Sequence, residues 1–163
     1  MNLSLRINSP EDESGTNDSD SNNTPDYPEY NYEKIAEVLG RELEAIYPDA
    51  ENYELAEISL SFVSAEEIRE LNKAYRDTDE STDVLSFPID DDMNIPVLML
   101  GDIVICPEET QRLHPELSPR DALCLMIAHS FLHLLGYDHD TDEKQKSMWE
   151  LQEAIAEKLR EAA

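Results

Sequence analysis

Apolar residues recur at intervals of three and four in three segments of this chain, 32–46, 64–75 and 141–161. That interval gathers them on one face of a helix, so each segment is predicted to form an amphipathic helix. The second segment opens with Ser64 and has Glu67 three residues later, which is the sequence pattern of a capping box. A local start signal therefore supports the helix that the spacing predicts.

Four other segments have the patterns of strands. Apolar and polar residues alternate over 2–8 and, from Ile58 onward, over 55–63, as in strands with one buried face. The segments 82–87 and 98–106 are rich in β-favouring residues, and each is followed by a proline. Strands and helices are mixed along the chain without strict alternation, so the predicted fold class is α+β.

The segment 118–135 is apolar almost all round, and it is predicted to be a central, buried helix. Ser118 suits the N-cap position, Pro119 suits the first helical position, and Asp121 favours the positive end of the helix. Burial of this helix matters for chemistry, because it would hold the histidines near its end in fixed positions.

The composition predicts one domain, 1–163, because the chain has 163 residues and 40% of them are hydrophobic. Residues 9–28 differ from the rest: they are polar and acidic, include no basic residue, and are predicted to be a disordered acidic insertion. The two cysteines stand in apolar runs and are predicted to be buried thiols, as in a cytoplasmic protein. No apolar run is long enough to span a membrane.

The charge of the chain is strongly negative. Asp and Glu number 38 against 12 Lys and Arg, which gives a formal net charge of −26. Such a surface repels nucleic-acid phosphates unless a local basic patch or high salt offsets the charge. The charge therefore weighs against a nucleic-acid substrate, although a salt-rich cell interior would also account for it.

Three of the four histidines lie within eleven residues. His129 and His133 are four residues apart, so they would project from the same side of the predicted helix. Gly136 is placed to end that helix in a left-handed conformation, so that His139 approaches from the following loop. Three imidazoles leave one tetrahedral position open to water, as in a catalytic zinc site. We therefore predict one Zn²⁺ on a zincin-like metal-binding helix, although nickel and copper suit the same ligands.

The histidine spacing also matches the long zinc-protease motif H-E-x-x-H-x-x-G-x-x-H, with one change. Ser130 stands where the proteases have the glutamate that acts as general base. A serine hydroxyl does not accept a proton from zinc-bound water near neutral pH, so peptide hydrolysis would lack its base. Chemistry that needs mainly a Lewis acid and a metal hydroxide stays open.

Several sequence blocks precede the histidine motif: LNKAYR at 71–76, STDVLSFP at 81–88 and LGDIVI at 100–105. Together with HSFLHLLGYDH at 129–139, they resemble the YbeY family of bacterial metallo-endoribonucleases. The resemblance begins at about residue 55 and includes most of the chain after it. It implies an α+β fold with a small mixed four-stranded sheet packed with about five helices.

The resemblance implies a zinc-dependent, single-strand-specific endoribonuclease that acts in maturation of the 3′ end of small-subunit ribosomal RNA and in ribosome quality control. Its partners would be single-stranded ribosomal RNA and the small ribosomal subunit or its proteins, with no membrane and no DNA. The family's zinc ligands map onto His129, His133 and His139, and its motif arginine maps onto Arg76. Two features depart from the family: Ser130 replaces the usual glycine, and the acidic insertion has no counterpart.

Other polar residues have competing interpretations. Arg76 is the candidate for phosphate binding and for stabilising transition-state charge, with a surface salt bridge as the alternative. Asp138 is a candidate to orient an imidazole or a water molecule, or else a turn residue. Asp83 and Asp102 flank predicted strands and are expected to make structural hydrogen bonds. His114 lies outside the motif and is left out of the site.

Two other functions stay open. The negative charge favours a non-catalytic ribosome-assembly factor in which zinc organises a binding surface, because an acidic surface suits basic ribosomal proteins better than RNA. A zinc-loaded protein that binds ribosomes but never cuts RNA would support that function. A different zinc hydrolase, such as a peptidase, is the weaker alternative, and chelator-sensitive cleavage of casein would revive it.

Overall fold

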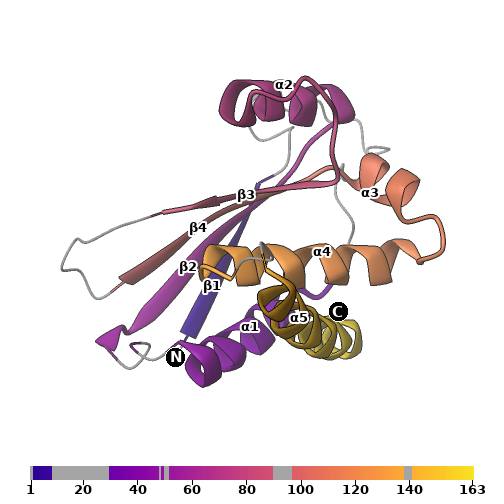
Figure 1. The fold of residues 1–163 in the computed structure, drawn as a ribbon. Helices are drawn as coiled ribbons and strands as arrows, with labels where there is room; N and C mark the ends of the chain where they lie inside the picture. Colours follow the sequence, from indigo (N-terminus) through magenta and orange to yellow (C-terminus); the bar gives the residue numbers. More distant parts are fainter. Residues whose placement is uncertain (1, 9–29, 48, 50–51, 90–96, 138–140) are drawn as a thin grey trace, which may run out of the picture.

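The predicted α+β class is confirmed by a computed structural model in which the described residues form a four-stranded sheet and five helices (Figure 1). The described residues are 2–8, 30–47, 49, 52–89, 97–137 and 141–163. The predicted insertion at 9–28 lies outside them. The elements are β1 (Asn2–Asn8), α1 (Tyr32–Ile46), β2 (Leu55–Phe62), α2 (Ala65–Arg76), β3 (Val84–Pro88), β4 (Val97–Ile105), α3 (Pro107–Leu113), α4 (Pro119–Leu134) and α5 (Asp142–Ala162).

The sheet is mixed. Its strand order is β1–β2–β4–β3, with β1 and β4 parallel to β2, and with β3 antiparallel to β4. The two neighbours β3 and β4 are joined through 89–96, whereas the parallel pairs need crossovers through α1 and through α2 with β3. This arrangement puts β3 at an edge of the sheet, beside α4.

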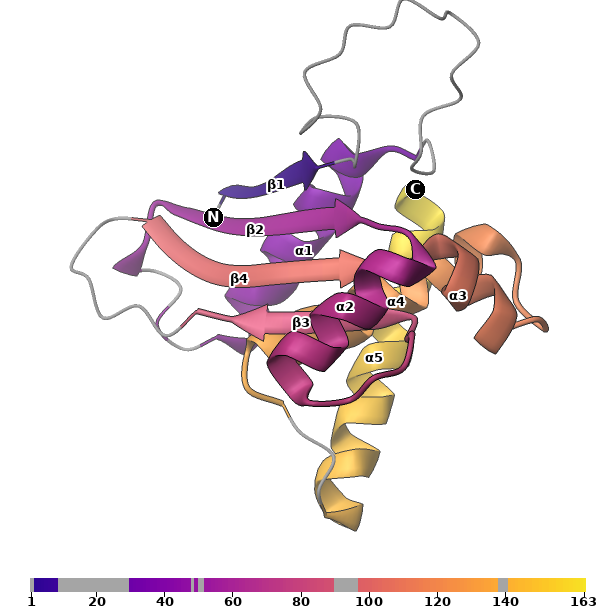
Figure 2. The same cartoon turned by 90° about the horizontal axis from the view of Figure 1, so that it is seen from above.

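Helices cover both faces of the sheet, and the alternating burial along β2 explains why. Ile58, Leu60 and Phe62 are fully or almost fully buried in the core formed with α1, α4 and α5. Ser59 and Ser61 alternate with them and point to the opposite face, where α2 lies (Figure 1). Seen from above, α2 crosses over β4 and β3 (Figure 2).

The core on the α2 face is small. This core contains four buried residues, and it is separate from the larger core on the other face of the sheet. The four residues are Ile68 from α2, Leu85 from β3, Val104 from β4, and Cys106.

The central position predicted for the segment 118–135 is confirmed. α4 has sixteen residues, of which ten are buried. The Ser118 hydroxyl accepts a hydrogen bond from the Asp121 backbone N–H at 3.1 Å, and Pro119 takes the first helical position. Gly136, just past the end of α4, has a φ of 94°, the left-handed conformation expected of it.

One helix was not predicted from local sequence. Pro107 follows β4, and we took it only as the end of that strand, but it also begins α3. Cys106 takes the N-cap position, where its sulfur accepts a hydrogen bond from the Glu109 backbone N–H at 3.4 Å. A proline is compatible with both roles, because the first position of a helix needs no N–H donor.

The cysteines are buried and unbridged, as predicted. Desolvation raises the pKa of the Cys124 thiol to about 11, so this thiol is protonated near neutral pH and unreactive as a nucleophile. Among the described helices, none has both the length and the apolar character that crossing a membrane would require.

Candidate functional site

The structure brings His129 and His133 together on α4. Their Nε2 atoms are 3.0 Å apart, and their ring centroids are separated by 4.5 Å at an interplanar angle of 77°. The prediction that both imidazoles project from the same side of the helix is confirmed. Both side chains are partly buried, so the two nitrogens meet at the border between the core and solvent.

Gln152 of α5 fixes the orientation of His129. Its Oε1 lies 2.7 Å from His129 Nδ1. An amide oxygen only accepts hydrogen bonds, so Nδ1 carries the imidazole proton and the lone pair of Nε2 is directed toward His133. Gln152 was missed in the sequence, although a polar residue on the buried face of α5, one turn from Met148, was the available signal.

The donors of this pair suit a metal ion. Two ligand nitrogens of a tetrahedral zinc ion are separated by about 3.3 Å, close to the spacing seen here. A hydrogen bond from imidazole to an amide oxygen is also the usual support of a metal-binding histidine. The other predicted members of the site, Asp138 and His139, lie outside the described residues, and the described part of the chain contains no group of three candidate ligands.

Ser130 lies between the two histidines in sequence but points into the protein. The residue is fully buried, and its Oγ has no hydrogen-bond partner among the described residues. Within the described part of the chain no base is hydrogen-bonded to the hydroxyl, so none is positioned there to activate it.

Replacing Ser130 with alanine should stabilise the fold by about 1–2 kcal/mol, because the change removes an unpaired buried hydroxyl. Urea unfolding of wild-type and Ser130→Ala protein measures this difference. Ser147→Ala is the matched control: Ser147 is an exposed helical serine on α5, so it reports the gain in helix propensity alone. An equal effect at both positions, or a loss of stability at Ser130, would contradict the expectation.

Arg76 is the last residue of α2 and is exposed. It lies on the face of the sheet opposite α4, with the edge strand β3 between them (Figure 1). The structure therefore does not place Arg76 in contact with the histidine pair. Its guanidinium has no ion pair within the described ranges, so the alternative of a surface salt bridge is not supported there.

Arg69 on the same helix is different. Its Nε donates a hydrogen bond to Asp79 Oδ1 at 2.8 Å, and this bond lowers the pKa of Asp79. The positive charge of Arg69 is therefore already matched by a carboxylate. Of the two arginines on α2, Arg76 is the one whose charge is available to a ligand.

The structural role predicted for Asp83 is confirmed, whereas no described residue supports the one predicted for Asp102. Asp83 accepts a hydrogen bond from the Val84 backbone N–H at 2.8 Å, and its other oxygen lies 3.0 Å from His114 Nε2. His114 thus has a structural partner and stays outside the site. Asp102 lies within β4 rather than beside it, is exposed, and accepts no hydrogen bond from any described residue.

The described residues form two cavities near the elements that carry the candidate site. One, of about 410 Å³, lies where the chain leaves α4 and enters α5, and it is lined by Leu135, Gly136, Tyr137 and residues of the first turns of α5. The other, of about 440 Å³, lies between α2 and the sheet. We call it the sheet-face cavity; it is lined by Ser59, Ser61, Leu71, Tyr75, Phe87, Asp102 and Val104.

Comparison with known proteins identifies relatives along most of the chain. The family model described as Endoribonuclease YbeY matches residues 19–160, so the match begins inside the segment that we interpreted as an insertion. The Endoribonuclease YbeY of Clostridioides difficile is 46% identical over 134 residues, which are 78% of this chain and 84% of that protein. The Endoribonuclease YbeY of Caldanaerobacter subterraneus is 40% identical over 135 residues, which are 75% of this chain and 85% of that protein.

A solved structure shares the fold. The solution structure of TM1509 from Thermotoga maritima aligns with a TM-score of 0.51 and 29% sequence identity, covering 96% of this chain and 89% of that one. The family model, the two relatives and the fold agree with one another. We conclude that this chain belongs to the Endoribonuclease YbeY family.

Proposed function

We propose that this protein is a zinc-dependent, single-strand-specific endoribonuclease that matures the 3′ end of small-subunit ribosomal RNA and acts in ribosome quality control. Membership of the YbeY family supports the reaction class. The observation that carries the metal dependence is the histidine pair, with Nε2 atoms 3.0 Å apart and one ring held by Gln152.

In this proposal His129, His133 and His139 hold the zinc ion. Zinc, when bound, supplies a Lewis acid for a phosphodiester oxygen and lowers the pKa of a bound water to about 7. Gln152 keeps the His129 ring in the tautomer that presents Nε2 to the ion. Because α4 is buried along most of its length, the two ligands on it are held rigidly, as a reactive site requires.

Arg76 binds a phosphate of the substrate strand, since a guanidinium can donate two parallel hydrogen bonds to phosphoryl oxygens. Arg76 and α4 lie on opposite sides of β3, and this arrangement defines the path of the RNA over the protein. The strand passes from the α2 face around the edge formed by β3 to the histidines. A single strand can follow this path more easily than a stiff duplex, which fits single-strand specificity.

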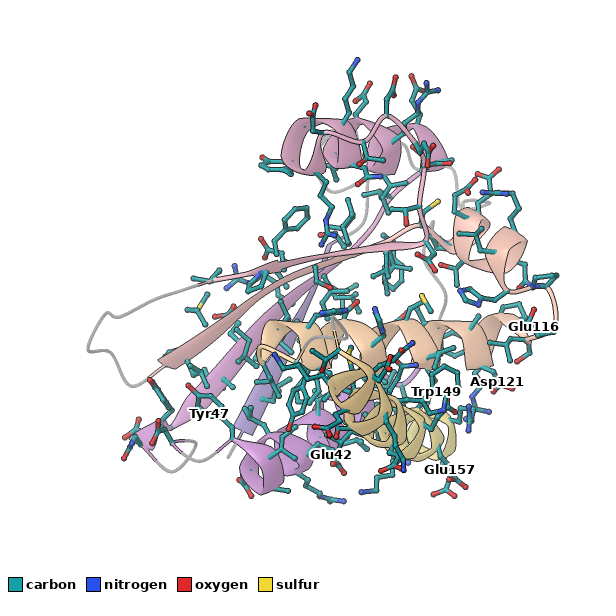
Figure 3. The ribbon with its side chains drawn as sticks, viewed as in Figure 1. Glu42, Tyr47, Glu116, Asp121, Trp149 and Glu157 are labelled. Carbon is teal, nitrogen blue, oxygen red and sulfur yellow. The ribbon has the colours of Figure 1, made fainter. Side chains whose placement is uncertain are left out.

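The net charge of −26 is the main physical obstacle to RNA binding. Part of that charge lies away from Arg76 and the α2 face: the carboxylates of Glu42, Asp121 and Glu157 belong to α1, α4 and α5 on the opposite side of the sheet, and Glu116 belongs to the loop between α3 and α4 (Figure 3). Added salt screens the repulsion between the strand and these distant groups, whereas Arg76 contacts its phosphate directly.

Removing the guanidinium of Arg76 tests the proposal. Arg76→Ala should lower kcat/KM for single-stranded ribosomal precursor RNA by about 10²–10³-fold, the usual loss for one charge-stabilising donor. Arg69→Ala is the matched control, and it should stay near wild-type activity because that arginine is already paired with Asp79. Cleavage is followed across a salt series, with end-group analysis of the products.

Three results would contradict the proposal: equal activity of both variants and wild type, equal cleavage of duplex RNA, or no cleavage at any salt concentration. The last result, combined with ribosome binding by the zinc-loaded protein, would favour the non-catalytic assembly factor, which the acidic surface supports.

A further inference from the structure

The sheet-face cavity lies outside the histidine pair and has the size of a ligand site. Its volume of about 440 Å³ falls in the range of small-molecule pockets. Its walls combine apolar, aromatic and polar groups. Leu71 and Val104 are apolar, the serines of β2 supply hydroxyls, and a carboxylate comes from β4. This mixture suits a flat, partly polar ligand rather than a purely apolar one.

An exposed aromatic ring stands at the cavity. Tyr75 is 70% exposed, an unusual exposure for so large a side chain on a structured helix. It meets Phe87 of β3 edge to face, with ring centroids 5.3 Å apart and an interplanar angle of 66°. Phe87 thereby holds the tyrosine ring in place, while much of that ring stays available for stacking. Bases of single-stranded nucleic acids stack on aromatic side chains presented in this way.

The carboxylate of Asp102 sets what the cavity accepts. It is exposed, lines the cavity, and receives no hydrogen bond from the described residues. An ionised carboxylate only accepts hydrogen bonds, and it repels phosphate. The group that enters must therefore be a base edge that donates hydrogen bonds. Guanine presents two adjacent donors, N1–H and the exocyclic amino group, which match the two oxygens of a carboxylate; uracil presents one N–H.

Positive charge stands at the end of α2, one residue beyond the aromatic ring. Arg76 follows Tyr75, ends the helix and is exposed. A basic side chain near a stacking ring is a common combination in proteins that bind single strands, with the ring on the base and the cation on the backbone. The base would then enter the cavity while its phosphate stays outside, near Arg76.

We propose that the sheet-face cavity binds one unpaired nucleobase of the RNA substrate, guanine in preference to uracil, with Tyr75 stacking on the base and Asp102 accepting its hydrogen bonds. The inference rests on the proposed function, because it takes RNA to be the substrate. It adds a specificity subsite on the face of the sheet away from the histidines, so the recognised base lies some nucleotides from the cleaved bond.

Binding and cleavage of short oligouridine strands with a single guanosine at successive positions test the proposal. Fluorescence anisotropy with 2′-O-methyl strands measures affinity, and the ribose strands measure cleavage. Wild-type protein should bind the best guanosine strand more tightly than oligouridine, and inosine, which lacks the amino group, should lose part of this preference. Asp102→Asn should reduce the guanosine-to-uridine affinity ratio by about tenfold, because the amide NH₂ of asparagine would face one of the two N–H donors of guanine.

Two further variants separate stacking from folding effects. Tyr75→Leu should weaken binding of both strands by about tenfold, whereas Tyr75→Phe, which keeps the ring, should restore it. Glu150→Gln is the matched control for the aspartate: it makes the same carboxylate-to-amide change at an exposed position of α5 and should leave the affinity ratio intact. Melting temperatures check that each variant is folded.

The outcomes distinguish this inference from the proposed function. Strands that are cut, but with a base preference that Asp102→Asn does not change, would overturn the inference and leave the nuclease function standing. Strands that show the Asp102-dependent preference in binding but are never cut would overturn the nuclease function and support the cavity. A wild-type protein with no base preference at any position would overturn the inference directly.

Discussion

His133→Ala should abolish RNA cleavage, lowering kcat/KM by at least about a thousandfold. The substitution removes a nitrogen that lies 3.0 Å from His129 Nε2, so the remaining imidazole loses its partner in the proposed zinc site. The loss should have two readouts: no cleavage of single-stranded RNA, and less than the wild-type amount of zinc in elemental analysis of the purified protein.

His114→Ala is the matched control for the loss of an imidazole. His114 is also a partly buried histidine, but it is paired with Asp83 and lies away from the pair on α4. This variant should keep its zinc and its cleavage activity, even if the loss of the contact with Asp83 lowers its melting temperature. Full cleavage by His133→Ala, or by wild-type protein stripped with a chelator, would exclude a metal role in the reaction.

Gly101→Ala should destabilise the fold by about 4 kcal/mol or more, enough to unfold many domains of this size. A β-carbon at this position would lie 2.3 Å from the Phe87 carbonyl oxygen and 3.0 Å from Pro88 Cα. Both obstacles are backbone atoms of β3, so relief requires β3 to move away from β4. The φ of 139° adds strain for any residue with a β-carbon.

Gly136→Ala provides the comparison for this prediction. Gly136 also has a positive φ, of 94°, but a β-carbon there would meet nothing within 4 Å. Its substitution should therefore cost only the conformational penalty, about 1–2 kcal/mol. Urea unfolding gives both values when the variants fold, and expression as insoluble protein reports the severe case. A similar loss of unfolding free energy at the two glycines would contradict the prediction that the contact with the β3 backbone makes Gly101→Ala the more damaging change.

Features set by neighbouring residues were predictable from the sequence. The Ser64 and Ser118 caps start α2 and α4 where the cap pattern indicated, because a cap depends on residues within one turn. The pairing of His129 with His133 followed from the helical period. Pro107 shows the limit of such reasoning, since the same residue ends one element and begins another, and only one of its roles was recognised.

Features that depend on residues distant in sequence were not predictable. The sequence marks Gln152 as a polar residue on the apolar face of α5, but its contact with His129 exists only because α5 packs along α4. The strand order, with β3 between Arg76 and the histidines, likewise depends on which segments pair in space.

The small core beneath α2 has a consequence for how the two faces of the molecule behave. α4 is buried in the larger core, whereas α2 packs on the sheet mainly through Ile68 and a few partly buried neighbours. Local detachment of α2 from the sheet therefore requires less free energy than unfolding the whole domain. Such a local opening leaves the helical layer on the opposite face folded. The α2 side of the sheet can therefore adapt its shape to different RNA strands, while the two imidazoles on the other side keep their positions.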